Sequence, residues 1–144
     1  MVNAADLRRA RAGDRALAGA DLSQANLAGL NLAGADLRRA NLFGTILSGA
    51  NLMRAELGEA ILSAANLTGV DLSAANLVEA NLLRANLTRA NLSGANLENA
   101  TLVDANLTQA SLWGADLKGA KLAGATVHET TLPVDWARMV RSKP

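Results

Sequence analysis

Apolar residues return every five positions along most of this chain. Leucine occupies the third place of each pentapeptide from Leu17 to Leu132, in 23 of 24 consecutive units, with Val127 as the exception. Alanine fills the first place in 19 of these units, and the second place is asparagine in eleven and aspartate in four. Places four and five vary, although glycine takes the fifth place ten times. We number these places as positions one to five.

A period of five fits neither regular secondary structure. On an α-helix at ~100° per residue, successive leucines would stand ~140° apart, and no apolar face would form. On a flat strand the odd period would send alternate leucines to opposite sides of the sheet. The pattern predicts a short extended piece followed by a corner, with positions one and three pointing inward and position two outward. If each corner turns by about a right angle, four units close a square coil, and the 24 units give about six coils.

The predicted core and corners follow from stacking these coils. Each leucine would pack on the leucine of the next coil, which gives inward columns such as Leu37, Leu57, Leu77, Leu97 and Leu117. Position five is the third residue of the corner, where a type II turn needs a positive φ and favours glycine. Units with other residues there are expected to form a type I-like corner; examples are Arg39, Ala64, Glu79 and Gln109. The position two side chains are expected to bond the backbone at corners and one another in ladders.

The unbroken A-(N/D)-L-x-x register over about residues 15–134 resembles the pentapeptide repeat family. The resemblance implies an all-β fold, a right-handed quadrilateral parallel β-helix, and the handedness comes from the resemblance alone. Its uniform leucines and helical N-terminal cap are similar to those of many cyanobacterial members whose roles are unassigned.

The two ends depart from the repeat, as the ends of a solenoid must if they are to cover its core and edges. We expect a helical cap over residues 1–14, with Asn3 as N-cap and Gly13 after its last turn, and the β-helix over 15–134. Residues 135–144 are expected to form a C-terminal cap or tail, in which Trp136, Met139 and Val140 share one helical face. That face is either a lid on the last coil or a dimer contact, because some family members dimerise through their C-terminal end.

The composition lacks most of the residue types that catalytic and metal sites use. The chain has no cysteine or tyrosine and one histidine, His128, so the sequence predicts no catalytic residues, no metal site and no cofactor, and we expect no enzyme. Fourteen basic and thirteen acidic residues leave a net charge of +1, which predicts no direct nucleic-acid binding. No apolar run is long enough for a membrane span or a secretory signal, so we expect no membrane contact and a cytoplasmic location.

Function is therefore expected on the outer surface, where the coil aligns residues twenty positions apart. One face carries an acidic stripe of Glu56, Glu59, Glu79, Glu98 and Asp116, with Asp36, against Arg38, Arg39 and Lys118. The next face carries an apolar strip, which the repeat does not require, of Phe43, Ile61, Leu83 and Val103. A third face stacks Ser48, Thr68, Thr88 and Thr108, a solvated ladder.

Two functions are open to such a rod. The first is a non-catalytic scaffold that binds an unidentified protein partner, with the apolar strip as the preferred site, acting as a monomer or an end-to-end dimer. The strip also has a plain explanation, since apolar and β-branched side chains favour extended backbone. The second follows from the family, some members of which resemble duplex DNA and act on DNA gyrase. The net charge of −3 between residues 16 and 132 and the lack of phenylalanine at position three count against it.

Overall fold

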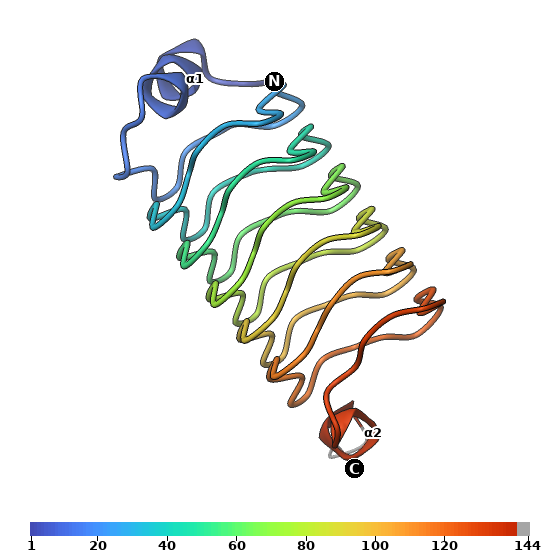
Figure 1. The fold of residues 1–144 in the computed structure, drawn as a ribbon. Helices are drawn as coiled ribbons and strands as arrows, with labels where there is room; N and C mark the ends of the chain where they lie inside the picture. Colours follow the sequence, from blue (N-terminus) through green and yellow to red (C-terminus); the bar gives the residue numbers. More distant parts are fainter. Residues whose placement is uncertain (141–144) are drawn as a thin grey trace.

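The fold is a rod of stacked coils with a short helix at each end (Figure 1). The computed structural model describes residues 1–140, with helix α1 (Ala4–Arg11) at the start and helix α2 (Trp136–Val140) at the end. Between the helices, position two of each unit forms an isolated parallel β-bridge with position two of the unit twenty residues further on. Twenty such bridges run without a slip from Ala16 and Asp36 to Ser111 and Thr131. The repeat of five therefore produces a coil of four units and four corners, as the pattern predicts.

Backbone hydrogen bonds between coils hold the stack together. The N–H groups of positions three and five donate to the following coil, and the N–H of position two donates to the preceding one. In one unit these bonds are Leu82 N–H to Thr101 O at 2.7 Å, Arg84 N–H to Val103 O at 2.9 Å and Asn81 N–H to Ala60 O at 2.9 Å. The N–H of position one donates within the chain to position three of the preceding unit and closes the corner. Four of the five N–H groups of a regular unit thus have backbone acceptors.

The side chain at position two supplies the fifth acceptor. In all fifteen units with asparagine or aspartate there, its Oδ1 accepts the N–H of position four at 2.9–3.2 Å. This is an Asx-turn, and it bears out the predicted bond between side chain and corner backbone. The predicted ladder between position two side chains is largely wrong: within residues 1–140 one such bond is found, from Asn76 Nδ2 to Glu56 Oε2 at 2.9 Å. The side-chain oxygens are used within their own units.

The corners are more uniform than the sequence predicts. All 23 residues at position five from Gly19 to Glu129 have positive φ, ten of them glycine and thirteen not. The expectation of type I-like corners is therefore wrong for Arg39, Ala64, Glu79 and Gln109, whose φ values are 59°, 57°, 58° and 59°. The bonds from positions one and five fix the same geometry in every corner, so stacking overrides the local preference of each residue. A left-handed conformation costs a residue with a side chain roughly 1–2 kcal/mol.

The interior is a narrow stack of leucine and alanine. Leu37, Leu57, Leu77, Leu97 and Leu117 are all 0 % exposed, and alanines at position one lie beside them. Thr45 is a polar residue in this core, and its hydroxyl donates to Leu42 O at 2.8 Å. The predicted core column is confirmed, and the side chains free to make specific contacts lie outside it.

Helix α1 covers the start of the rod and satisfies its exposed edge. Asn3 is its N-cap and accepts the N–H groups of Ala5 and Asp6. In the first coil, three position two carbonyl oxygens have no preceding coil to bond and accept from the cap segment instead. Ala16 O accepts from Arg9 Nη2, Asp21 O from the Asn3 N–H, and Asn26 O from Arg11 Nη2. Three of the four sides of the first coil are therefore capped by this segment.

The first prediction tests the Asx-turn. Asn81→Ala should lower the free energy of unfolding by about 1 kcal/mol, because the Leu83 N–H loses its acceptor at 3.0 Å. Asn81→Asp keeps Oδ1 and should stay within about 0.5 kcal/mol of the parent protein. Urea unfolding followed by circular dichroism measures both. Equal losses for the two variants would contradict this role of the side chain.

The second prediction compares two glycines. Gly69 occupies position five with φ +65°, and a Cβ there would meet no atom within 4 Å, so Gly69→Ala tests conformation alone. It should destabilise the protein by about 1 kcal/mol. Gly58 occupies position four without a positive φ, and Gly58→Ala should stabilise the protein by about 0.4–1 kcal/mol. Thermal melts of both variants check the opposite signs; a shift in one direction for both would refute the argument.

Candidate functional site

The acidic stripe is less acidic in the structure than in the sequence. Arg38 forms an ion pair with Asp36 at 2.6 Å, and its hydrogen bonds lower the pKa of the Asp36 carboxyl to about 2. Arg39 pairs with Glu59 at 3.4 Å. Further along the stripe Lys118 pairs with Glu98 at 3.9 Å, while the Asp116 carboxylate closes its own corner by accepting the Lys118 N–H. Ion pairs with Arg38, Arg39 and Lys118 thus offset three of the six carboxylates on this face.

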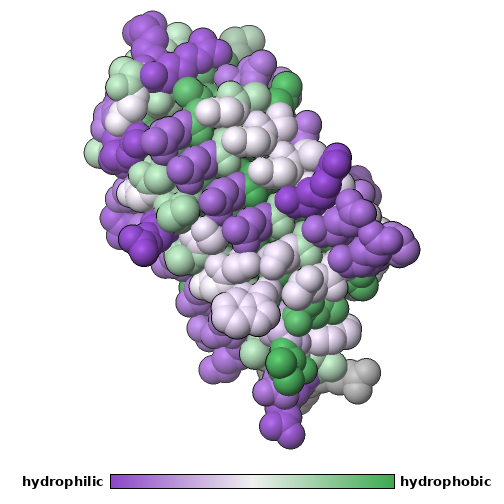
Figure 2. Space-filling view, viewed as in Figure 1, coloured by the Kyte–Doolittle hydropathy of each residue, from purple (hydrophilic) through white to green (hydrophobic). Residues whose placement is uncertain are grey.

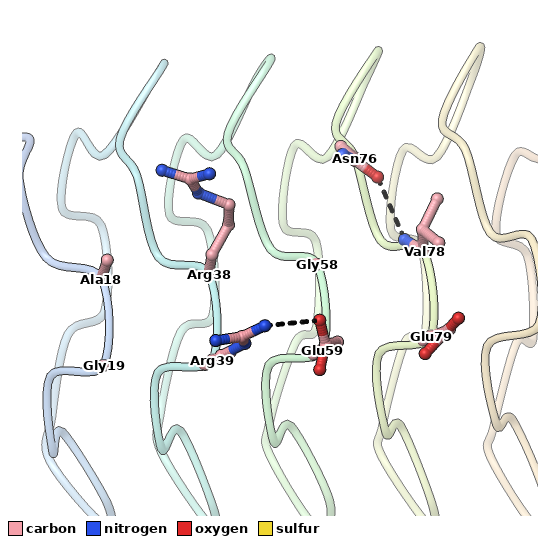
Figure 3. A pocket seen from close by; sticks show the side chains of 9 residues that line it. All are labelled: Ala18, Gly19, Arg38, Arg39, Gly58, Glu59, Asn76, Val78 and Glu79. Carbon is pink, nitrogen blue, oxygen red and sulfur yellow. Dashed lines mark hydrogen bonds and ion pairs between the residues drawn. The ribbon is translucent and has the colours of Figure 1, made fainter.

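Three carboxylates of the stripe remain outside these ion pairs, those of Glu56, Glu79 and Asp116. Glu56 accepts a hydrogen bond from Asn76, and Glu79 forms no ion pair or hydrogen bond through its side chain within residues 1–140. Glu79 lines an open hollow of about 660 Å³ on this face, and so does Asn76, the hydrogen-bond partner of Glu56. Figure 3 shows the residues that line it, with Gly58 between the coil of Arg38 and the coil of Val78. We call it the Gly58 hollow; it was not predicted from the sequence, because its extent depends on how the side chains around Gly58 lie.

The apolar strip lies on the neighbouring face. Phe43 and Ile61 are 43 % and 40 % exposed, and Leu83 and Val103 are half-buried. Ser63 separates Phe43 from Leu83 in the position four column. The four residues therefore form a broken line of apolar side chains along one face.

The threonine column on the third face is largely architectural. The hydroxyls of Thr68, Thr88 and Thr108 each donate to the position two asparagine of their own unit at 2.6–2.7 Å. The same asparagine oxygens accept the backbone N–H groups of these threonines. This pairing occupies the polar atoms that a ligand would need.

The C-terminal segment covers only part of the last coil. Trp136, Met139 and Val140 pack against the end of the core, as expected for a lid. Met139 accepts the Gly119 N–H with its carbonyl oxygen at 3.2 Å and the Leu117 N–H with its sulfur at 3.5 Å. Helix α2 thus takes the place of a further coil along one face, and core positions elsewhere in the last coil stay partly exposed, namely Leu122, Ala125, Val127 and Leu132.

Several exposed apolar residues were missed by the sequence argument. Trp113 is 71 % exposed and Val134 99 %, and both line a shallow hollow of about 340 Å³ beside helix α2. Figure 2 shows one side of the rod, where hydrophilic side chains form a column along the axis and strongly hydrophobic ones are scattered. The repeat leaves positions four and five unspecified, so the sequence pattern carried no signal for them.

Residues 1–140 contain no group of three or more histidine, aspartate or glutamate side chains placed to hold a metal ion. The exposed His128 lies 3.4 Å from Glu129. No helix within the same residues is long and apolar enough to cross a membrane.

Comparison with known proteins agrees with this geometry. The family model described as pentapeptide repeats matches eight copies, over residues 5–44, 16–58, 35–73, 65–102 and 100–133. The chain is a pentapeptide repeat protein. Proteins of this family form right-handed β-helices, which agrees with the coil described above. No match to a curated protein was found.

Three solved structures illustrate the range of similar proteins. The pentapeptide repeat protein Rfr23 from the cyanobacterium Cyanothece 51142 is 34 % identical with a TM-score of 0.68, over 89 % of this chain and 97 % of that one. HetL from the cyanobacterium Nostoc, described as involved in heterocyst differentiation regulation, is 31 % identical with a TM-score of 0.41, over 89 % and 76 %. QnrB1, a plasmid-mediated fluoroquinolone resistance protein, is 22 % identical with a TM-score of 0.63, over 78 % and 60 %. At that identity QnrB1 shows a shared fold and nothing about function.

Proposed function

We propose that this pentapeptide repeat protein is a non-catalytic scaffold of about six coils that binds another protein through the apolar strip. One observation carries the proposal: Phe43 and Ile61, in successive coils of one face, are 43 % and 40 % exposed. Exposed apolar side chains that the architecture does not require are typical of binding surfaces when they gather on one face. The repeat requires apolar residues only at positions one and three, whereas Phe43 occupies position four and Ile61 position two.

The surroundings of the strip support the same proposal. Arg84 and Asp104, which occupy position five on this face, lie 4.0 Å apart with exposed side chains. An apolar centre bordered by charged residues is the usual anatomy of a protein interface. The backbone beneath is fixed by coil-to-coil hydrogen bonds, so binding would order few main-chain groups and would lose little conformational entropy.

The third prediction tests the strip. Phe43→Ala combined with Leu83→Ala should weaken binding of the natural partner at least about tenfold, since an apolar anchor contributes on the order of 1–2 kcal/mol or more. The partner is first identified by cross-linking in cells, and affinity is then measured with purified proteins by calorimetry. The matched control is Thr68→Ala with Thr88→Ala on the third face, which should leave affinity unchanged. Unchanged affinity in the strip variant, with an intact circular dichroism spectrum, would remove the strip as the binding site.

A second copy of the chain is the other partner that we propose. The incompletely covered last coil exposes Val127 at 40 %, and within residues 1–140 the Val127 N–H has no hydrogen-bond acceptor. Two rods meeting end to end would bury such groups and cover the edge of the sheet.

The fourth prediction concerns this end. Sedimentation velocity should show a dimer at micromolar protein, and Val127→Lys should shift it to monomer because it places a charge at the buried contact. Met53→Lys is the control, since Met53 is a partly exposed apolar residue, at 38 %, in the second coil and away from the C-terminal end. A monomer at every concentration tested would refute end-to-end pairing.

The DNA-mimic alternative has no observation in its favour. A mimic of duplex DNA needs a dense row of unpaired negative charge. On the acidic stripe, however, Arg38, Arg39 and Lys118 each pair with a carboxylate. The scaffold is therefore the function that the surface supports better.

A further inference from the structure

The Gly58 hollow is a departure from the repeat that the architecture does not explain. Among the 24 units, glycine occurs at position four only at Gly58, and all the remaining units have a side chain there. Its φ is not positive, so the backbone does not demand glycine, and a Cβ would approach only the Val78 carbonyl oxygen at 3.8 Å. An alanine would therefore fit without strain. The missing side chain instead opens a hollow of about 660 Å³ whose lining includes Arg38, Glu59, Val78 and Glu79.

The floor of the hollow offers a free hydrogen-bond donor. Position two of this unit is Glu56, so the unit lacks the Asx-turn that satisfies position four in fifteen other units. The Glu56 carboxylate instead accepts from Asn76 Nδ2 at 2.9 Å. Within residues 1–140 no oxygen accepts the Gly58 N–H. Because glycine has no side chain, this N–H lies open to an incoming acceptor.

The charge around the hollow is negative after internal pairing. Arg38 is held by Asp36 and Arg39 by Glu59, and Figure 3 shows Arg39 directed toward Glu59. Glu79 is left without a charged partner in the described chain. The hollow thus combines a backbone donor on its floor with a carboxylate on its border.

We propose that the Gly58 hollow binds an extended segment of a partner protein that carries a lysine or arginine. A backbone carbonyl of the segment accepts the Gly58 N–H, and the basic side chain pairs with Glu79 in the following coil. Adjacent coils are ~4.8 Å apart and residues of an extended chain ~3.3 Å apart, so one residue and its side chain span the two groups. The inference rests on the chain acting by protein binding, but it assigns a face and a partner chemistry that the apolar strip does not.

Other occupants fit less well. An anion would need the guanidinium of Arg38 or Arg39, and both already pair with carboxylates, with Asp36 at 2.6 Å and Glu59 at 3.4 Å. A metal ion would need clustered ligands, and residues 1–140 hold no group of three suitable side chains. The basic segment alone uses both the free donor and the unpaired carboxylate.

The fifth prediction uses a random twelve-residue peptide library displayed on phage and selected on the full chain. Selected peptides should be enriched in lysine or arginine, and a representative synthetic peptide is then titrated by fluorescence anisotropy. Gly58→Val fills the hollow and should weaken binding at least tenfold, while Glu79→Gln should weaken it about threefold to tenfold and reduce its salt dependence. Valine already occupies position four at Val78 and Val103, so this variant should stay folded, which a thermal melt verifies.

Matched controls separate this site from other causes. Ser63→Val makes the same kind of change at position four of the next face, and Glu129→Gln removes an exposed carboxylate from a distant corner; both should leave affinity within twofold. Phe43→Ala with Leu83→Ala should also leave peptide binding unchanged. The test of the apolar strip as a binding site and the test of the Gly58 hollow can therefore fail independently of one another. Three results would overturn the inference: selected peptides without basic residues, equal binding by Gly58→Val, or no enrichment over the Gly58→Val protein.

Discussion

The backbone hydrogen bonds from one coil to the next are the interaction on which the regularity of the rod depends. Together with the corner bond they satisfy four N–H groups of a regular unit, and in fifteen of the 24 units an asparagine or aspartate oxygen satisfies the fifth. An unpaired backbone donor is costly when it is removed from water, so this local acceptor stabilises the units that have it. The asparagine of the repeat therefore serves as a hydrogen-bond acceptor for the backbone, and its Oδ1 is not free to bind a ligand.

Uniform stacking forces many corner residues other than glycine into a strained left-handed backbone conformation. Thirteen residues other than glycine adopt positive φ, among them Ala64 and Ala74, which have no polar side chain to favour it. Each inter-coil bond is formed only if the corner has the same shape as its neighbours, so the collective bonding outweighs a strain of roughly 1–2 kcal/mol per residue. A fixed backbone follows, and the surface can vary at positions four and five without changing the coil.

The sequence predicted the parts of the molecule that repeat and missed the parts that do not. The period of five excluded helix and flat sheet and predicted the coil of four units and the inward leucines, while Asn3 and Gly13 predicted the N-terminal helix. The corner geometry at Arg39 or Gln109 was predicted wrongly, because local turn preference was weighed without the bonds between coils. The ion pairs of the acidic stripe and the Gly58 hollow could not be derived, since both depend on which way long side chains lean and on what a missing side chain uncovers.

Departures from the repeat therefore carry more information about binding than the repeat does. From Asn66 to Asn96 every position two is asparagine or aspartate, whereas Ile46, Glu56 and Ile61 interrupt the pattern just before that run. Each of the three forgoes a corner bond worth about 1 kcal/mol. Ile46 and Ile61 replace it with apolar side chains that are 39 % and 40 % exposed, and Glu56 leaves a bare N–H at the floor of a hollow. None of these changes improves packing in the core or pairing between coils, and all three expose groups that another molecule could cover. The stretch from Ile46 to Ile61 is thus a region where position two serves the outer surface in place of the corner, and part of the apolar strip and the Gly58 hollow both lie there.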